Sequence, residues 1–285
     1  MPKLPPRRPD SHKGDYGRAL LIGGSWGMAG AIALSGMACL RSGAGLVRLA
    51  IPSSILGTVA GFEPSYMTLP LTSSASTGQI NGSAAQRELT EHLRSATAIT
   101  IGPGMGQNGD LTQLVLWVYR TATQPVVVDA DALNALASLP DGLAEAGGPR
   151  ILTPHPGEYW RLSKLPGGAR RRDELAASAR QTAKRYGLII VLKGNETLIA
   201  DGVRNVINTT GNPGMATGGS GDVLTGIITA LVCQGLSPFD AAVLGAHVHG
   251  LAGDLAAAEL GQVSLIASDL VRYLPKAFQA VSDYA

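Results

Sequence analysis

The chain has 285 residues, of which 45% are apolar and 15% are charged, and its formal net charge is +2. This even charge balance argues against nucleic acid or a membrane surface as a partner, and no apolar run is long enough to span a membrane. Two cysteines, and an N-terminus without the apolar stretch of a secretory signal, predict a cytoplasmic protein with reduced thiols.

Short β-branched runs alternate with amphipathic stretches along the chain. The runs that predict strands cover residues 18–23, 46–52, 98–102, 125–131, 151–154 and 188–194. Helices are expected at residues 29–42, 111–121, 176–186, 222–233 and 238–260. Because the strand runs are continuously apolar, they predict a mostly parallel central sheet with helices on both faces, which is an α/β fold.

The domain organisation predicted from the sequence is simple. Residues 1–12 are proline-rich and polar and predict a flexible N-terminal segment, and residues 13–285 predict a single domain because no linker divides them. The Ser-, Thr- and Gly-rich residues 61–83 predict a surface excursion. In a parallel sheet, ligands bind beyond the carboxyl ends of the strands, so the loops after the runs are the candidate site.

The glycine-rich stretch "NPGMATGGSGDVLTG", residues 212–226, stands before an apolar helical run. It fits neither the dinucleotide fingerprint nor the Walker A loop, which needs a lysine that is missing here. Successive glycines at a helix start direct backbone N–H groups at one place and favour an anion such as phosphate. Asp222 beside that anion suits a base for a hydroxyl that is being phosphorylated, and the alternative is an ordinary helix-end carboxylate.

Several motifs in order together carry a family resemblance. They are "KGDYGRALLIGGSWGMAGAIALSGMACLRSGAGLV", "IGPGMG", "VVDADALN", "TPHPGE", "VLKGNET", "TGGSGDVLTGIITALVCQG" and "AAVLGAHVHGLAGDLAA". From Lys13 to about Ala258 the chain resembles the ADP-dependent NAD(P)H-hydrate dehydratases of the ribokinase-like superfamily. The resemblance implies a ribokinase-like fold and a hydro-lyase that returns the S epimer of hydrated NADH or NADPH to the reduced coenzyme, with ADP giving AMP and phosphate.

The resemblance also implies cofactors and partners. They are Mg²⁺, ADP or ATP as co-substrate, a homo-oligomer that could be a tetramer, and a separate epimerase that interconverts the hydrate epimers. Two other functions stay open: a small-molecule hydroxyl kinase similar to hydroxyethylthiazole kinase, and a nucleotide-sensing protein without catalysis. The presence of Asp222 disfavours the second of these.

Site residues follow from the resemblance, motif by motif. Asp222 would contact the substrate and act as base, and the N–H groups of Gly219, Ser220 and Gly221 would stabilise the transferring phosphoryl group. Gly221 would also contact the nucleotide. The segment "KGNET" would cradle that nucleotide, with the charge of its lysine directed at phosphate; its members are Lys193, Gly194, Asn195, Glu196 and Thr197. A strand-end lysine that merely reaches solvent is the alternative.

The substrate would also contact Ala44, Gly104, Gly106 and His155, while Glu158 and Asp129 would lie near the metal, either directly or through water. Ordinary turn geometry also explains the glycines, and His155 and Glu158 also suit structural roles at a helix start. Asp131 and Asn134 could join a Mg²⁺ site, and Asp131 suits a helix cap equally well. His247 and His249, two positions apart, make a poor metal pair and suit packing or an interface.

Overall fold

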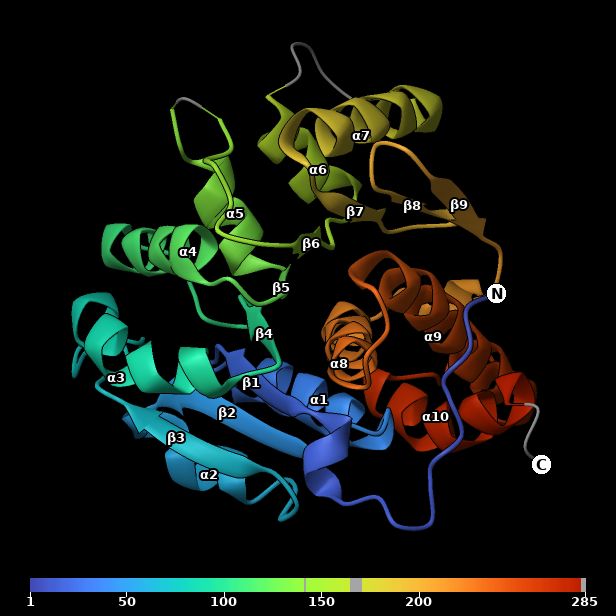
Figure 1. The fold of residues 1–285 in the computed structure, drawn as a ribbon, viewed down its shortest axis with the longest axis horizontal. Helices are drawn as coiled ribbons and strands as arrows, with labels where there is room; N and C mark the ends of the chain where they lie inside the picture. The colour runs from blue at the N-terminus through green and yellow to red at the C-terminus, as the bar shows by residue number, and fades with distance from the viewer. Residues whose placement is uncertain (141, 165–170, 283–285) are drawn as a thin grey trace.

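The computed structural model describes residues 1–140, 142–164 and 171–282, and at its centre is a nine-stranded sheet (Figure 1). The strand order is β3-β2-β1-β4-β5-β6-β7-β8-β9, and β1 to β7 are parallel while β8 and β9 are antiparallel. The strands are β1 (Arg18–Ile22), β2 (Leu46–Pro52), β3 (Met67–Leu71), β4 (Ala98–Ile101), β5 (Val126–Val128), β6 (Arg150–Leu152), β7 (Ile189–Leu192), β8 (Thr197–Ala200) and β9 (Asn205–Asn208).

Helices cover both faces of this sheet, which confirms the predicted fold class. The α-helices are α1 (Ala29–Arg41), α2 (Leu56–Ala60), α3 (Gly82–Ser95), α4 (Gly109–Thr121), α5 (Asp131–Ala137), α6 (Pro156–Ser163), α7 (Arg172–Tyr186), α8 (Ser220–Cys233), α9 (Pro238–Leu260) and α10 (Ala267–Val281). Short 3₁₀ turns occupy Lys13–Tyr16, Ser53–Ile55 and Pro213–Met215.

All six predicted strands are present. Of the three that were not predicted, β3 and β9 are the two edge strands of the sheet, and β8 lies between β7 and β9. β3 lies inside the predicted surface excursion and contains Pro70. An edge strand tolerates proline because one side of it has no partner strand, so the missing N–H leaves no hydrogen bond unmade there. β8 and β9 form a four-residue hairpin pair, and β9 is half exposed. Short, partly polar edge strands lack the continuous apolar run that marks a buried strand.

The alternation of side chains along each strand divides the core between the two faces. Leu21 belongs to the core cluster that includes residues of α1, α8, α9 and α10, while Leu20 and Ile22 belong to the cluster that includes residues of α3, α4 and α5. A third cluster lies under α6 and α7. Because β1 to β7 are parallel, their carboxyl ends lie at one rim of the sheet. α8 packs on β1, β4 and β5, and its first residues lie at that rim.

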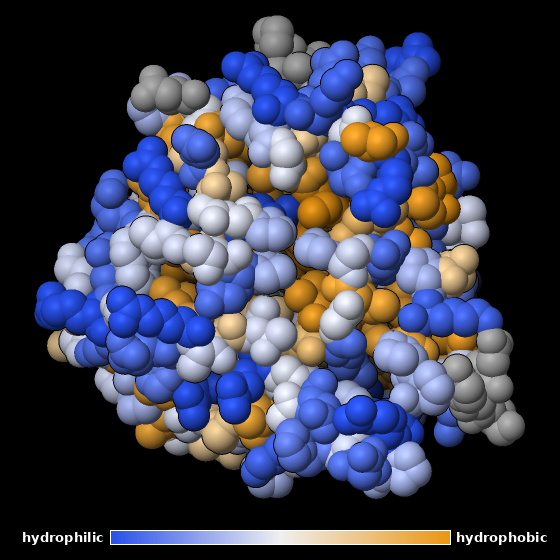
Figure 2. All heavy atoms as spheres, viewed as in Figure 1, coloured by the Kyte–Doolittle hydropathy of each residue, from blue (hydrophilic) through white to orange (hydrophobic). Residues whose placement is uncertain are grey.

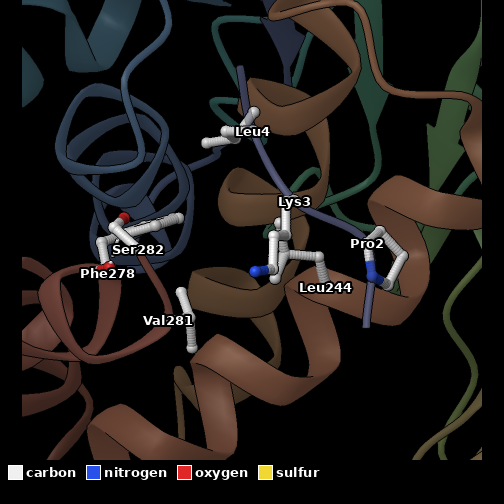
Figure 3. A pocket seen from close by; sticks show the side chains of 7 residues that line it. All are labelled: Pro2, Lys3, Leu4, Leu244, Phe278, Val281 and Ser282. Carbon is white, nitrogen blue, oxygen red and sulfur yellow. Dashed lines mark hydrogen bonds between the residues drawn. The ribbon is translucent and has the colours of Figure 1, made fainter. Parts of the chain in front are cut away.

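The N-terminal residues lie against α9 and α10 (Figure 3). Residues 1–12 form no helix or strand, but Leu4 packs on the core and Arg7 lies 3.8 Å from the ring centroid of Tyr16. Arg7 also donates a hydrogen bond of 2.7 Å to the carbonyl of Gly43. The hollow beside Leu4 measures only about 20 Å³, which is room for a single water. The flexibility of this segment stays a prediction.

Polar residues cover most of the face seen in Figure 2, and apolar residues reach the surface near β8 and β9. Val203, in the turn between these strands, is 91% exposed and Ile207 is 44% exposed. Across the described ranges with their gaps at 141 and 165–170, no helix combines the length and apolar character needed to cross a bilayer.

Candidate active site

The glycine-rich stretch forms the sharp entry into α8. Gly219 has a φ of +93°, a left-handed conformation that favours glycine, and a Cβ there would lie 2.7 Å from Leu34 Cδ1. The hydroxyl of Ser220 donates to the carbonyl of Met215 at 2.8 Å and anchors the turn. The backbone N–H groups of Gly221 and Asp222, in the first helical turn, have no carbonyl one turn earlier to bind. Of the predicted donors, the Ser220 N–H already binds the Thr217 carbonyl at 3.4 Å, and the anion site at this helix start stays a prediction.

Lys193 directly follows β7 and points to this helix start. Its Nζ lies 2.9 Å from Asp129 Oδ1 and 3.9 Å from Glu158 Oε2, and its side chain is 19% exposed. A Cβ placed at Gly221 would lie 3.0 Å from the same ammonium, so the lysine and the first turn of α8 are in near contact. The ends of β5, β6 and β7 thus bring three charged side chains to the start of α8.

The electrostatics of the cluster separate Asp222 from the other carboxylates. Burial, and then the negative charge of Asp129, raise the pKa of Asp222 to about 7, although Lys193 acts in the opposite direction. Burial by itself would lower the pKa of Lys193, but the carboxylates of Asp129 and Glu158 outweigh it and raise that pKa. Near neutral pH, Asp222 can therefore both take and release a proton, while Lys193 stays charged.

Asp129 is almost completely buried and both of its carboxylate oxygens have donors. Lys193 binds Oδ1, and the hydroxyl of Thr225 donates to Oδ2 at 2.8 Å. Thr225 was not among the predicted site residues. Its only signal in the sequence is its position one turn after Asp222 on the same helix, which places both side chains on one face.

His155 and Glu158 form a reciprocal cap at the start of α6. Nδ1 of His155 accepts the Gly157 N–H at 3.0 Å, and Glu158 Oε2 accepts the His155 N–H at 2.8 Å. Because Nδ1 accepts, the proton of the neutral ring is on Nε2, which lies 3.6 Å from Glu158 Oε1. The His155 side chain is 53% exposed, whereas Glu158 is buried beside Lys193. His155 and Glu158 thus have the structural role at a helix start that the sequence also suggested, and the His155 ring is still exposed.

The remaining residues of "KGNET" form the turn from β7 into β8. Gly194 and Glu196 both have positive φ, and the hydroxyl of Thr197 donates to the Gly194 carbonyl at 2.9 Å. Arg172 donates to the carbonyl of Glu196. Glu196 also borders an open hollow of about 390 Å³ beside α7. Of this segment, Lys193 is the residue that reaches the carboxylate cluster.

The loop after β4 contains Gly104 and Gly106, both with positive φ, so turn geometry accounts for these glycines. A Cβ at Gly104 would lie 2.7 Å from the Met28 carbonyl, and the Gly106 N–H donates to Asp131 Oδ2 at 2.8 Å. Asp131 is the first residue of α5, and the residue that caps this helix is Ala130, which has a φ of 50°. The carboxylate of Asp131 therefore anchors the glycine loop.

Ala44 lies away from the cluster. Its neighbour Gly43 is next to Gln234, the residue that ends α8. At about 1.5 Å per residue, the twelve positions from Asp222 to Gln234 span about 18 Å. The fold does not bring Ala44 to the carboxyl ends of the strands.

The donor groups near Lys193 bear on whether a metal ion could bind there. Among the residues that the structure describes, no group of three or more His, Cys, Asp or Glu side chains is arranged to hold a metal ion. Mg²⁺ in nucleotide sites commonly takes only one or two carboxylates, with phosphates and water as its other ligands. Asp129, Glu158 and Asp222 place three carboxylates beside the single charge of Lys193, and this surplus of negative charge is compatible with a cation held mainly by phosphates and water. Asn134 instead accepts from Arg161 Nε at 3.0 Å.

Two further polar residues support the helix start. His249 on α9 donates from Nε2 to the Ser220 carbonyl at 2.9 Å, and burial lowers its pKa to about 4, so the ring is neutral. Ser35 on α1 donates to the Asp222 carbonyl at 2.8 Å. Neither contact has a signal in the sequence, because α1 and α9 reach α8 only through tertiary packing.

Residues 19–276 match the family model described as NAD(P)H-hydrate dehydratase. The chain belongs to this family. Asp129, Glu158, Lys193 and Asp222 all lie within the matched residues.

Individual dehydratase relatives agree with the match. A bifunctional NAD(P)H-hydrate repair enzyme of Moorella thermoacetica is 45% identical over 275 residues, which are 96% of this chain and 51% of the relative. The chain thus spans about half the length of the curated relatives it matches.

Solved structures also agree. An ADP/ATP-dependent NAD(P)H-hydrate dehydratase of Bacillus subtilis, crystallised with ATP and Mg²⁺, is 32% identical with a TM-score of 0.82, covering 98% of this chain and 95% of that one. A ribokinase-like superfamily protein of Enterococcus faecalis, 29% identical, also has a TM-score of 0.82 and covers 97% of this chain and 92% of that one. The predicted ribokinase-like fold is confirmed.

Proposed function

We propose that this chain dehydrates the S epimer of hydrated NADH or NADPH to the reduced coenzyme, with ADP converted to AMP and phosphate. The observation that carries the proposal is the position of Asp222 at the start of α8, beside Lys193 and with a pKa raised to about 7. A base poised near neutral pH next to an anion site suits the phosphorylation of a hydroxyl group.

In the first step, Asp222 takes the proton of the C6 hydroxyl of the hydrate. The oxygen attacks the β-phosphorus of ADP, the bond to the bridging oxygen breaks, and AMP leaves. The N–H groups of the first turn of α8 would stabilise charge on the transferring phosphoryl group. Loss of phosphate from C6 and of a proton from C5 then restores the double bond, so the sum is hydrate plus ADP giving NAD(P)H, AMP and phosphate.

The other residues of the site would bind and orient. Lys193 would pair with the nucleotide phosphates, and the rest of "KGNET" would contact the same nucleotide. His155 would present its exposed ring to the dinucleotide, and the loop of Gly104 and Gly106 would line the substrate. Glu158, and Asp129 through water, would hold Mg²⁺, which when bound neutralises phosphate charge.

The proposal also covers the co-substrate, the partner enzyme, the cellular location and the oligomeric state. ADP or ATP as the co-substrate is supported by the Bacillus subtilis relative, which is described as dependent on either nucleotide. An epimerase partner is supported by the bifunctional relatives. We also propose a cytoplasmic location and a homo-oligomer, consistent with repair of a cytoplasmic coenzyme.

The experiment incubates the protein with hydrated NADH, ADP and Mg²⁺ and follows NADH absorbance together with AMP and free phosphate. We expect all three products, and no turnover without nucleotide. A stable phosphorylated product with no gain in NADH would establish a hydroxyl kinase instead. Dehydration that needs no nucleotide would contradict the proposed mechanism.

A further inference from the structure

An open hollow of about 530 Å³ lies between α5 and α6, next to the site but outside the carboxylate cluster. Its lining includes Gln107 from the glycine loop, Asn134 from α5, and Trp160, Arg161 and Lys164 from α6 and the residue that ends it. The volume lies within the range of ordinary small-molecule sites, and none of the steps described above uses these side chains.

The chemistry of the lining suits an aromatic base that carries phosphate. Trp160 is 42% exposed, so a broad indole surface faces solvent. The lining residues that the structure describes carry two cations and no carboxylate. Arg161 Nε donates to Asn134 Oδ1 at 3.0 Å, which holds the guanidinium in one orientation. A fixed guanidinium binds phosphate oxygens through charge-assisted hydrogen bonds, and an indole stacks on a purine.

Lys164, at the end of α6, has a different role in the hollow. Its Nζ donates to the carbonyl of Pro140 at 2.8 Å, just beyond α5. This contact ties the end of α6 to the end of α5 and keeps the two walls of the hollow together. Arg161 is therefore the cation available to a ligand.

The hollow adjoins the residues assigned to the substrate at two points. Gln107 directly follows Gly106, and its Nε2 donates to Asp131 Oδ1 at 3.2 Å, while Oδ2 holds the Gly106 N–H. Arg161 stands one turn after Gly157, and a Cβ at Gly157 would lie 3.9 Å from Arg161 and 2.9 Å from the His155 ring. A ligand that passes the glycine loop and His155 reaches Trp160 and Arg161 next.

We propose that this hollow binds the adenosine half of the dinucleotide hydrate, with the purine on Trp160 and a phosphate on Arg161. The inference rests on the proposed function, because it takes the substrate to be a nicotinamide dinucleotide. The ADP co-substrate is assigned elsewhere, at Lys193 after β7. Binding the remote half of the substrate positions the hydrated ring against Asp222 without any part in the chemistry.

The test measures binding without turnover, with adenosine 2′,5′-bisphosphate and 5′-AMP as probes and saturating ADP present. Calorimetry would compare the natural protein with Arg161→Gln, Trp160→Ala and Trp160→Phe. We expect the first two to weaken probe binding about tenfold or more, and Trp160→Phe, which keeps a ring, to retain most affinity. Arg87→Gln, a change of an exposed arginine on α3, is the matched control and should change nothing.

The probes identify the bound phosphate. If Arg161→Gln weakens binding of the bisphosphate alone, Arg161 binds the 2′-phosphate, and the protein should prefer the NADPH hydrate. If it weakens binding of both probes equally, Arg161 binds the 5′-phosphate. With the hydrate as substrate, KM should rise by a larger factor than kcat falls, and ADP affinity should not change.

Unchanged probe binding in both Arg161→Gln and Trp160→Ala, or displacement of the probe by ADP, would overturn the proposal. Probe binding as expected in a protein that makes no NADH would overturn the proposed function and leave the subsite in place. Normal turnover in a protein that does not bind the probes would overturn the subsite and leave the proposed function in place.

Discussion

The ammonium of Lys193 lies 2.9 Å from Asp129 Oδ1, which joins the end of β7 to the end of β5 across the intervening strand β6. Thr225 holds the second oxygen of Asp129, so the pair cannot rotate freely. The lysine charge is therefore shared mainly with Asp129 and Glu158. Burial first, and then the surplus negative charge of the cluster, raise the pKa of Asp222 toward neutrality.

Replacing Asp222 by Asn keeps the shape of the helix start and removes the base. Turnover should fall by about two to four orders of magnitude, the usual contribution of a positioned general base. ADP binding should survive or tighten slightly, because a negative charge near the phosphates is removed. Calorimetric ADP affinity and the NADH assay on the folded variant check both parts. Near-normal turnover would return Asp222 to the role of a helix-end residue, and His155 would be the next candidate base.

The pH profile should report the same carboxylate. Because a base acts when deprotonated and the pKa of Asp222 is about 7, kcat/KM should rise with pH and level off above that value. Asp129→Asn removes a negative neighbour that raises this pKa, so the rising limb should move to lower pH even if the maximum rate falls. Normalised profiles of the two proteins make the comparison. A limb that stays in place or moves to higher pH would argue against Asp222 as its origin.

Lys193→Ala should raise KM for ADP by a larger factor than it lowers kcat, if the ammonium mainly binds phosphate in the ground state. The change also leaves the buried carboxylate of Asp129 without its cation, so the free energy of unfolding should fall by about 3 kcal/mol. Lys184→Ala, on the exposed side of α7, is the control for both measurements. An unchanged KM for ADP would remove Lys193 from the nucleotide site.

Two glycines near the start of α8, Gly218 and Gly221, should differ in how well they tolerate a side chain. A Cβ at Gly221 would lie 3.0 Å from Lys193 Nζ, so Gly221→Val should displace the ammonium, and ADP binding and turnover should fail together. A Cβ at Gly218 would meet nothing within 4 Å, and its φ is not positive, so Gly218→Ala should bind and turn over almost normally. Circular dichroism confirms folding of both variants. Equal loss in the two would show that the loop needs glycine for another reason.

Asp222 should also cost the protein stability at neutral and alkaline pH. Its folded-state pKa lies above the unfolded value, so the folded protein binds more protons between about pH 4 and pH 7, and stability falls as pH rises through that window. Asp222→Asn should therefore raise the free energy of unfolding at pH 8 by roughly 1 to 4 kcal/mol, since one pKa unit corresponds to about 1.4 kcal/mol. Denaturant titrations at pH 4 and pH 8 test this, and a gain as large at pH 4 would contradict it.

The sequence by itself determined the architecture and the principal charged groups of the candidate site. Continuous apolar runs predicted the six buried strands, and Asp129 and Lys193 directly follow two of them, with Glu158 shortly after a third. Because parallel strands share one carboxyl rim, residues that follow different strands must lie near one another there. The edge strands β3 and β9 escaped prediction because an edge position does not require continuous apolar residues, and β8 escaped because its apolar run, residues 198–200, is only three residues long.

Only the tertiary structure decided how those groups are paired. It placed Thr225 and Lys193 on the two oxygens of Asp129, directed Asp131 to the glycine loop, and set His249 against the start of α8. It also left Ala44 at the far end of α8. Periodicity reports which side of its own helix or strand a residue occupies, whereas these contacts depend on how separate elements pack. Distances of a few ångströms between such elements, and the pKa values they produce, are consequences of that packing.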